Sequence, residues 1–272
     1  AGAEFAALFE REVQAAASLD HPGIVQVLDS GVVTPGEADP TRGIDAGAPW
    51  LAMEIASGGS LESRAGKASF AEIRGWLAEA LEALGHAHAR GVLHRDLKPA
   101  NLLLADPDDP RPGLKLSDFG IARLLTDGGW SSEGRGLVGT PIYMAPELFE
   151  ADPNEFGPWT DLYALGCVAF ELLAGAPPFQ APNILALVQA HVVHPVPLLP
   201  HRDDVPPGFQ AWIHRLLAKQ PGSRFQRAED AHAALLRSDG SSPPRRVPST
   251  WRQDADQAAA PVRLRGVGLG LV

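Results

Sequence analysis

The chain has 272 residues, of which 45% are hydrophobic and 21% are charged, so it can bury one sizeable core and is unlike a disordered acidic chain. Its formal net charge of -10 at pH 7 argues against a basic surface that binds nucleic acid. The single cysteine, Cys167, excludes an intrachain disulfide, and no run of about 18 apolar residues is present to span a membrane, so we expect a protein of the reducing cytoplasm.

The first part of the chain has the pattern of a helix followed by two strands. Apolar residues recur at helical spacing over residues 4–18, and His21-Pro22-Gly23 then ends the helix. Ile24–Leu28 and Trp50–Ile55 are apolar runs of strand length. Residues 34–49 between them are rich in Gly, Pro and Asp, and we expect them to form a long exposed loop.

Helices dominate after residue 70. An amphipathic pattern over Phe70–Arg90 ends at Gly91, and two short strands, Leu102–Leu104 and Leu114–Leu116, surround a turn rich in Asp and Pro. Further helices are expected at residues 160–174, 183–192, 208–218 and 228–237. Strands mixed with one long helix and followed by a mostly helical half indicate an α+β chain with two unequal lobes.

The clearest chemistry lies in residues 94–101, His-Arg-Asp-Leu-Lys-Pro-Ala-Asn, a loop between a long helix and a strand. Asp118-Phe119-Gly120 follows the next strand. Phosphoryl transfer requires a carboxylate that orients the attacking hydroxyl, oxygen ligands for Mg2+, and positive charge beside the transferred group. Asp96 offers the carboxylate, Asn101 and Asp118 offer the oxygen ligands, and Lys98 offers the charge. A loop that merely caps strands and turns would account for one of these residues but not for the set.

These motifs resemble those of the eukaryotic-type protein kinases, and specifically of their bacterial serine/threonine members. Asp118 follows Asp96 by 22 residues, as the order of the family's motifs requires. Ala145-Pro146-Glu147 then closes an activation segment, with Gly139-Thr140-Pro141 shortly before it. The resemblance covers roughly residues 1–237.

The resemblance implies a protein-kinase-like fold of two lobes. Residues 1–56 would be part of a truncated, β-rich N-lobe, residues 57–237 the mostly helical C-lobe, and residues 238–272 a linker. Asp161–Gly166 resembles the start of the central buried helix of the C-lobe. Arg224 resembles the arginine that pairs with the glutamate of the Ala-Pro-Glu motif.

The implied activity is transfer of the γ-phosphoryl group of ATP to Ser or Thr hydroxyls of protein substrates in bacterial signalling, with ATP and Mg2+ as cofactors. Asp96 would be the catalytic base, Lys98 would contact the γ-phosphate, and Asn101 and Asp118 would hold the metal. Lys98 also separates this pattern from that of the tyrosine kinases. The expected partners are ATP and proteins with Ser or Thr, with no nucleic acid and no membrane segment.

The same resemblance assigns residues to the nucleotide side of the site. Glu12, on the first helix, matches the glutamate that pairs with the ATP-binding lysine, and Met53 matches the gatekeeper. Glu54 and Ala56 would offer backbone groups to adenine, and Leu103 would pack beneath it. A hydrophobic column that links the lobes would consist of Ala16, Val27, His94 and Phe119.

The family's Gly-rich loop and ATP-binding lysine are missing from the sequence before Glu12, and the first lysine in the chain is Lys67. We therefore expect both features upstream of Ala1, and an impaired nucleotide site in the chain as given. At the other end, Pro261–Val272 is an apolar stretch at the end of the linker segment. A segment that leads to a further domain and a frayed tail account for it equally well.

Four residues carry an expectation about regulation: Arg95, Ser131, Ser132 and Thr140. In relatives with an arginine before the catalytic aspartate, as Arg95 is here, a phosphate on the activation segment pairs with it. Ser131 and Ser132 are the hydroxyls expected to carry that phosphate, with ordinary polar loop residues as the alternative. Thr140 is expected to form a hydrogen bond with the catalytic loop.

Two other classes of function share part of this pattern. A pseudokinase that binds partners without catalysis is the alternative, at least for the chain as given, although the complete set of catalytic motifs argues against it. A small-molecule phosphotransferase of the kinase-like group would share the H-x-D-x-x-x-x-N loop. Such enzymes lack the Ala-Pro-Glu segment and the Gly-Thr-Pro platform that are present here.

Overall fold

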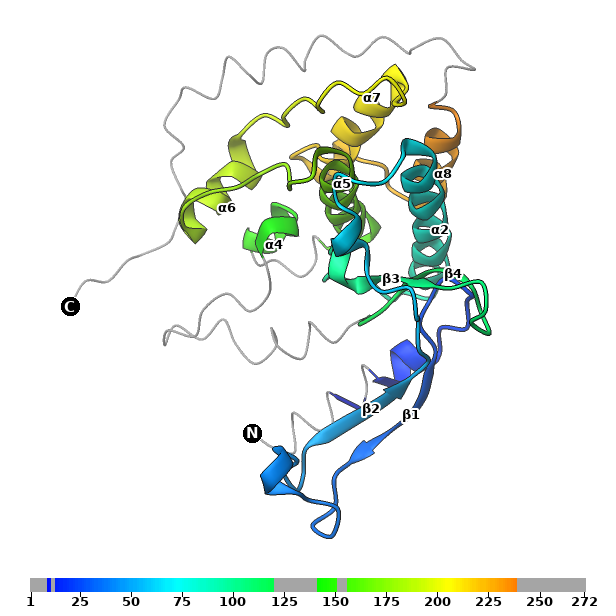
Figure 1. Ribbon diagram of the computed structural model, residues 1–272. Coiled ribbons are helices and arrows are strands. Elements are labelled where there is room, and N and C mark those ends of the chain that lie inside the picture. The colour runs from blue at the N-terminus through cyan, green and yellow to red at the C-terminus, as the bar shows by residue number, and fades with distance from the viewer. Residues whose placement is uncertain (1–8, 11–12, 120–140, 151–155, 239–272) are drawn as a thin grey trace, which may run out of the picture.

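The computed structural model of the chain describes residues 9–10, 13–119, 141–150 and 156–238 (Figure 1). Within these residues a small β-sheet lobe precedes a helical lobe, which confirms the expected α+β fold with two lobes. The strands form two antiparallel pairs, β1 (Val27–Val32) with β2 (Pro49–Met53), and β3 (Leu102–Ala105) with β4 (Gly113–Leu116). The helices whose bounds are described are α2 (Phe70–His88), α4 (Glu147–Glu150), α5 (Pro158–Ala174), α6 (Ile184–Val193), α7 (Pro207–Leu216) and α8 (Ala228–Leu236).

Helix α2 begins with a capping box. The Glu72 N–H donates to Ser69 Oγ at 3.3 Å, and the Glu72 carboxylate accepts a hydrogen bond of 2.9 Å from the Ser69 N–H. Its inner face is fully buried at Ile73, Leu77, Ala80, Leu81 and Leu84. The helix ends at His88, two residues before the predicted end, and the chain then turns through Gly91, whose φ of 73° suits a residue without a side chain.

Helix α5 is the centre of the helical lobe, and nearly all of its side chains are buried, as predicted from the apolar run around Cys167. It passes very close to α7. A Cβ atom on Gly166 would lie only 2.8 Å from the Cβ atom of Leu216, so the two helices approach this closely because Gly166 has none. Helices α5, α6, α7 and α8 begin and end within two residues of their predicted bounds, whereas α4 was not predicted. None of the helices in the described ranges is long and apolar enough to cross a lipid bilayer.

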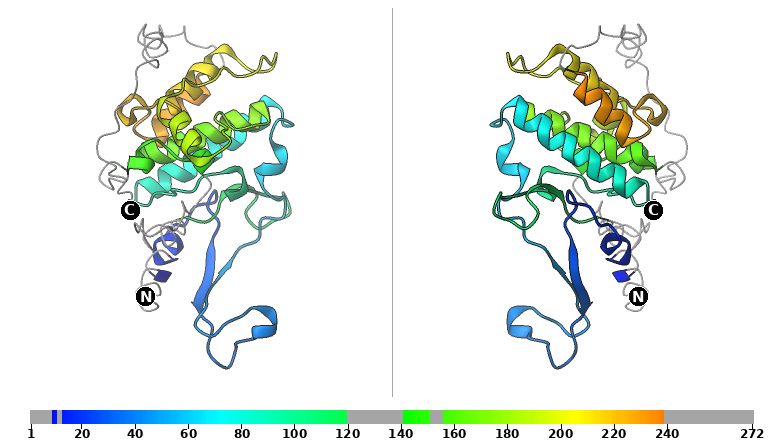
Figure 2. Two further views of the ribbon diagram at one scale, coloured as in Figure 1. Left: turned by 90° about the vertical axis from the view of Figure 1, so that its left-hand side faces the viewer. Right: turned by 90° about the vertical axis from the view of Figure 1, so that its right-hand side faces the viewer.

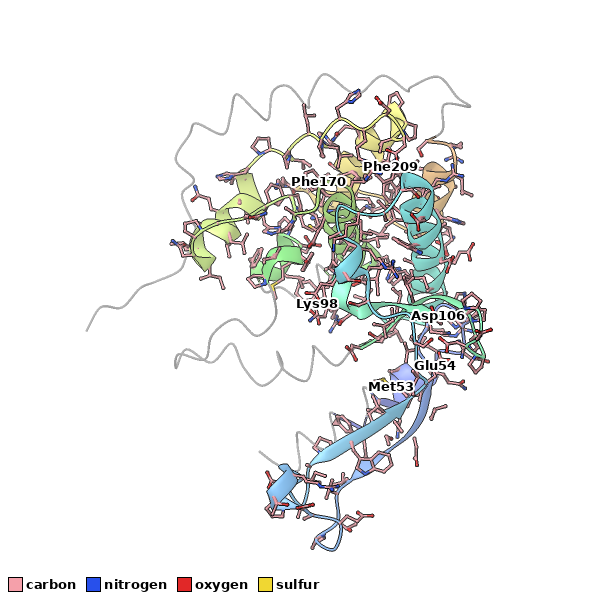
Figure 3. All side chains as sticks on the ribbon, in the orientation of Figure 1. Met53, Glu54, Lys98, Asp106, Phe170 and Phe209 are labelled. Atoms are coloured by element: carbon pink, nitrogen blue, oxygen red, sulfur yellow. The ribbon has the colours of Figure 1, made fainter. Side chains whose placement is uncertain are left out.

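Most buried apolar side chains form one cluster between α2, α5, α7 and α8 (Figure 3). Aromatic rings extend this cluster across helices, since Phe209 lies 4.9 Å from the Phe70 ring in an edge-on contact and stacks 5.2 Å from the Trp212 ring. Each fully buried side chain of this size stabilises the fold by about 1.5–3 kcal/mol relative to its exposed state. The helical lobe is therefore a rigid support for the loops at its edge.

The β1–β2 hairpin extends away from the helical lobe in each view (Figure 2). Its side chains are far less covered, with Leu28 62% and Val32 46% exposed. The loop between the strands is exposed, as predicted, and it contains a short 3-10 turn at Pro40–Arg42. This lobe contributes little to the packed core.

The predicted strand Ile24–Leu28 is wrong in its bounds. Strand β1 begins at Val27, because the residues before it pair with the helical lobe instead. Ile24 forms a parallel bridge with Leu116 of β4, and the Val25 N–H donates to the Leu116 carbonyl at 2.9 Å. The segment that leads into β1 is thus attached to β4.

Candidate active site

The catalytic loop, residues 94–101, is anchored to helix α5 by one buried carboxylate. Asp161 accepts hydrogen bonds of 2.8 Å from the backbone N–H groups of His94 and Arg95, and its Oδ2 lies 2.8 Å from His88 Nε2. Burial alone would raise the pKa of Asp161, but the His88 ring and the backbone donors bring that pKa below its usual value. The carboxylate therefore stays ionised and holds the loop. We call Asp161 and its three donors the catalytic-loop anchor.

Two residues of the site have left-handed backbone conformations that side chains disfavour. The φ angle is 64° at both Arg95 and Asp118, and among the described residues no other non-glycine residue has a positive φ. Such conformations cost about 1–3 kcal/mol each and persist where the surroundings enforce them. The structure thus stores strain at the catalytic loop and at the aspartate of Asp118-Phe119-Gly120.

Asp96, Lys98 and Asn101 converge on one carboxylate. Asp96 Oδ2 accepts a hydrogen bond of 2.6 Å from Lys98 Nζ and one of 3.1 Å from Asn101 Nδ2, which also donates to the Asp96 carbonyl at 2.9 Å. The Asp96 and Lys98 side chains are 24% and 26% exposed, so both remain open to a substrate. The site thus presents a carboxylate and an ammonium group side by side (Figure 3 labels Lys98).

Asn101 and Asp118 offer oxygen atoms suited to a hard cation such as Mg2+. The Asn101 amide nitrogen is used by Asp96, which leaves its amide oxygen as the unused group. The Asp118 carboxylate has no hydrogen bond or ion pair within the described part of the chain. The described residues also contain no group of three or more His, Cys, Asp or Glu side chains that could hold a metal by themselves. The Ser117 N–H donates to the Asn101 carbonyl at 3.0 Å and ties the two segments together.

Part of the expected hydrophobic column is in place. The rings of His94 and Phe119 lie 4.5 Å apart, and both residues are almost completely buried. Burial lowers the pKa of His94, so the ring is neutral at pH 7. Ala16 packs against the same core, and Val27 is half-buried at the start of β1.

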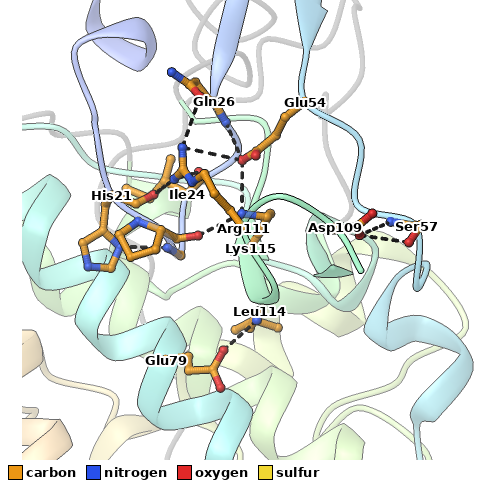
Figure 4. A network of polar contacts seen from close by, with 12 residues as sticks. His21, Ile24, Gln26, Glu54, Ser57, Glu79, Asp109, Arg111, Leu114 and Lys115 are labelled. Atoms are coloured by element: carbon orange, nitrogen blue, oxygen red, sulfur yellow. Dashed lines mark hydrogen bonds and ion pairs between the residues drawn. The ribbon is translucent and has the colours of Figure 1, made fainter. Parts of the chain in front are cut away.

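The hinge between the lobes is held by a second polar network, composed of Gln26, Glu54, Arg111 and Lys115 (Figure 4). Glu54 Oε1 accepts a hydrogen bond of 2.9 Å from the Gln26 N–H and lies 3.2 Å from Lys115 Nζ, which also donates to the Pro22 carbonyl at 3.0 Å. Arg111 donates to the carbonyls of the turn before β1. We call these residues the hinge network.

The hinge leaves particular backbone groups unused. The Glu54 N–H donates to the Gln26 carbonyl at 3.0 Å, so only the Glu54 carbonyl is available to adenine. The Ala56 N–H takes part in no hydrogen bond among the described residues. Met53 ends β2 and is 37% exposed, and Leu103 lies on β3, half-buried.

The predicted pairing of Arg224 with the Ala-Pro-Glu glutamate is confirmed. Arg224 Nη1 and Nη2 each lie 2.8 Å from one oxygen of Glu147, and both side chains are buried. Thr160 Oγ1 also donates to Glu147, at 2.9 Å. This pair joins α4 to the chain after α7.

Several site residues were not predicted from the sequence. Asp161 was predicted only as the first residue of the central buried helix and not as a residue that holds the catalytic loop. His88, which also holds this loop, and Lys115, which holds the hinge, carry no signal in the sequence. A fourth is Tyr143, whose hydroxyl donates to Glu171 at 2.7 Å. The Asp161 role could have been suspected, because a carboxylate within an otherwise apolar buried run needs donors.

Glu12, Ser131, Ser132 and Thr140 lie outside the described residues, so nothing is said of their placement. The larger cavity, about 340 Å3, is not at the catalytic loop; it is bordered by residues of α4, α5, α6 and the turn after α7. A cavity of about 20 Å3 lies behind the catalytic loop, against Arg95 and Asp161. The catalytic residues Asp96 and Lys98 thus do not border the cavity of about 340 Å3.

Comparison with known proteins agrees with this geometry. A sequence model described as "Protein kinase domain" matches residues 3–235. The serine/threonine-protein kinase PknB of Mycolicibacterium smegmatis is 35% identical over 259 residues, which are 93% of this chain and 39% of that protein. The serine/threonine-protein kinase PknJ of Mycobacterium tuberculosis is 38% identical over 263 residues, which are 93% of this chain and 42% of that protein.

The crystal structure of the Mycobacterium tuberculosis PknI kinase domain is also similar, with a TM-score of 0.60 and 28% identity over 86% of this chain and 79% of that one. The chain spans about two fifths of the length of the curated relatives it matches. The matches cover both lobes and every motif from the catalytic loop to Arg224. The chain belongs to the protein kinase family, among the eukaryotic-type serine/threonine kinases of bacteria.

Proposed function

We propose that the protein transfers the γ-phosphoryl group of ATP to Ser or Thr hydroxyls of protein substrates, in signalling within the bacterial cytoplasm. The observation that carries this proposal is the convergence of Lys98 and Asn101 on the Asp96 carboxylate, at distances of 2.6 and 3.1 Å. A base, a cation and an oxygen ligand within one loop match what phosphoryl transfer requires.

Each residue has a distinct part in the proposed reaction. Asp96 accepts a hydrogen bond from the attacking hydroxyl and later its proton. Lys98 moves from its ion pair with Asp96 toward the transferred phosphoryl group and balances its charge. Asn101 and Asp118 are the residues that would hold Mg2+, which would supply positive charge to neutralise the phosphates.

The nucleotide side of the proposal rests on the hinge. The unused Glu54 carbonyl and Ala56 N–H supply one acceptor and one donor, a pair suited to the edge of adenine. Met53 and Leu103 would lie against the faces and rear of the ring, and Glu12 would pair with an ATP-binding lysine. In this proposal residues 1–56 belong to the N-lobe, 57–237 to the C-lobe and 238–272 to a linker.

We extend the proposal to regulation by a phosphate on Ser131 or Ser132. Arg95 Nε is buried and has no hydrogen-bond partner among the described residues, and Arg95 lines the same small cavity as Asp96. A phosphate that paired with Arg95 would add charge-assisted hydrogen bonds there. Thr140 would bond to the catalytic loop. In the full-length protein, replacing both serines by Ala should lower autophosphorylation and substrate turnover, whereas unchanged rates would place the switch elsewhere.

The test of the function uses the full-length protein with labelled ATP, Mg2+ and casein as acceptor. We expect label on phosphoserine and phosphothreonine and none on phosphotyrosine, and we expect EDTA to remove it. Asp118→Asn should abolish most of the transfer, while Asp203→Asn, at a fully exposed side chain, should leave it unchanged. Transfer that persists in Asp118→Asn, or that appears on tyrosine, would contradict the proposal.

A further inference from the structure

The residues that follow the hinge run alongside β3. The Gly58 N–H donates to the Leu104 carbonyl at 2.8 Å, and the Leu104 N–H donates to the Gly59 carbonyl at 2.7 Å. A Cβ atom on Gly58 would lie only 2.8 Å from the Leu104 carbonyl oxygen, so this close approach requires a glycine. These contacts fix the chain after the hinge, but none of them involves Ala56.

Ser57, the residue next to Ala56, is held by a turn of the helical lobe. Asp109 Oδ2 accepts a hydrogen bond of 3.0 Å from the Ser57 N–H and one of 2.9 Å from Ser57 Oγ (Figure 4). The same oxygen accepts a hydrogen bond of 2.8 Å from the Asp106 N–H, within the turn between β3 and β4. One carboxylate thus joins the end of the hinge to this turn.

Asp109 is the carboxylate of this turn that binds the backbone of Ser57. Asp106 Oδ2 also lies 3.1 Å from Ser57 Oγ, but a hydroxyl has one hydrogen and donates it to one acceptor. The Ser57 N–H and hydroxyl lower the pKa of Asp109 below its ordinary value, with burial opposing them. Asp109 is therefore ionised at neutral pH, and its hydrogen bonds with Ser57 are charge-assisted.

The two residues before Ser57 have no support of this kind. Neither the Ile55 backbone nor the Ala56 backbone forms a hydrogen bond among the described residues. The chain is fixed before them, where the Glu54 N–H donates to the Gln26 carbonyl, and after them, at Ser57. The direction of the Ala56 N–H is therefore set by the two fixed ends of this short span.

We propose that Asp109 is a positioning residue for the nucleotide: by holding Ser57, it directs the Ala56 N–H toward N1 of adenine. The inference rests on the proposed function, in which the Glu54 carbonyl and the Ala56 N–H face the edge of adenine. That edge presents an amine, which donates, beside N1, which accepts. A fixed N–H favours a ring with an acceptor at this position, because a ring without one leaves the N–H unpaired.

The experiment compares ATP with 1-deaza-ATP, in which a C–H group replaces N1, as substrates of the full-length protein. The KM of the parent should be about tenfold higher for 1-deaza-ATP, which is the scale of one hydrogen bond. Asp109→Ala should raise the KM for ATP about threefold to tenfold and leave kcat within about twofold. Its KM for 1-deaza-ATP should stay within about twofold of the parent value, because the bond to Ala56 is already absent.

Two outcomes of this comparison would overturn the proposal. An unchanged KM for ATP in Asp109→Ala would show that Ala56 does not depend on Asp109. An equal rise for both nucleotides would make Asp109 a structural residue only. If the parent used both nucleotides equally well, the adenine pairing at the hinge would be wrong and this inference with it, whereas transfer of label from ATP tests the phosphoryl transfer separately.

Two variants in the same turn are matched controls. Asp108→Ala removes the same charge at an exposed side chain that has no hydrogen bond or ion pair among the described residues, and it should leave both KM values unchanged. Loss of a negative charge would by itself favour an anionic nucleotide, so a raised KM in Asp109→Ala has the opposite sign to a charge effect. Asp109→Asn keeps an oxygen that accepts from Ser57 and should restore most of the parent KM. If Asp109→Asn matched Asp109→Ala, the hydrogen bonds to Ser57 would not be the cause.

Hydrogen exchange tests the positioning without any nucleotide. The Ser57 amide should exchange several-fold faster in Asp109→Ala than in the parent, because it loses its acceptor, and at the parent rate in Asp108→Ala. The Gly58 amide, which donates to Leu104, should stay unchanged in both variants. Unaltered exchange of the Ser57 amide in Asp109→Ala would refute the link between Asp109 and the hinge.

Discussion

The catalytic loop and the hinge are both held by polar networks, but the two are built differently. In the catalytic-loop anchor, three donors meet Asp161, which is 1% exposed, at distances that are all 2.8 Å. In the hinge network, the Glu54 side chain is 14% exposed, and its partners lie between 2.9 and 4.0 Å away. The anchor is short and sealed, whereas the hinge network is longer and partly open to water.

The difference follows from what each network joins. The anchor connects two parts of the same lobe, the catalytic loop and α5, which share one packed core. The hinge network connects two lobes, and ion pairs that stay in contact with water are weaker and easier to rearrange. The geometry thus fixes the reacting residues firmly and leaves the joint between the lobes adjustable.

The largest effect is expected on turnover, from a variant that removes the catalytic base and leaves the catalytic-loop anchor intact. Asp96→Asn keeps the size of the side chain and does not touch Asp161, so the anchor and the fold should be unchanged. Loss of the base should lower turnover by about 10²- to 10⁴-fold. Steady-state kinetics of the full-length protein, with circular dichroism as the folding control, measure both. Turnover within about threefold of the parent would remove Asp96 from the assigned role.

The next variant breaks the anchor itself. In Asp161→Asn the amide nitrogen faces N–H donors, and three charge-assisted hydrogen bonds are lost or weakened. Breaking such a buried ionic group typically costs about 3–5 kcal/mol. Chemical denaturation should show this loss, and turnover should also fall because Arg95 and Asp96 lose their support. A variant as stable as the parent would mean that the loop is held by other contacts.

The sequence predicted the anchored region better than the hinge. The catalytic loop, the buried helix α5 and the Glu147–Arg224 pair all belong to motifs of the kinase family, so the resemblance predicted them even though the pair joins residues 77 positions apart. The hinge contacts join Pro22, Glu54 and Lys115, which are far apart in the chain. The sequence around Lys115 does not indicate that its side chain pairs with Glu54. The start of β1 was misplaced for the same reason, because pairing of Ile24 with β4 is a long-range contact that overrides the local apolar pattern.

A third site in the helical lobe uses neutral partners instead of charges. Tyr163 OH lies 2.9 Å from His191 Nδ1, and burial lowers the pKa of His191 to about 4. Between pH 6.5 and 4 the unfolded chain binds a proton that the folded chain does not, so the free energy of unfolding should fall as the pH decreases, by about 2–3 kcal/mol. His191→Asn, which keeps an acceptor for Tyr163, should flatten this part of the profile, as urea titrations at several pH values would show. His201→Asn, at an exposed side chain, should leave the pH dependence of the free energy of unfolding unchanged. If both variants showed the same pH dependence, His191 would not be its source.

The smallest effect is expected at the hinge, where Glu54→Gln is the counterpart of Asp161→Asn. The Gln26 N–H can still donate to the new amide oxygen, and only the attraction to Lys115 and Arg111 is lost. Because the Glu54 side chain is partly exposed, the cost should be about 1 kcal/mol. Hydrogen exchange should quicken several-fold at the Gln26 and Glu54 amides and stay unchanged in α5. If α5 exchanged faster as well, the two networks would be coupled, and the contrast between a fixed loop and an adjustable hinge would be wrong.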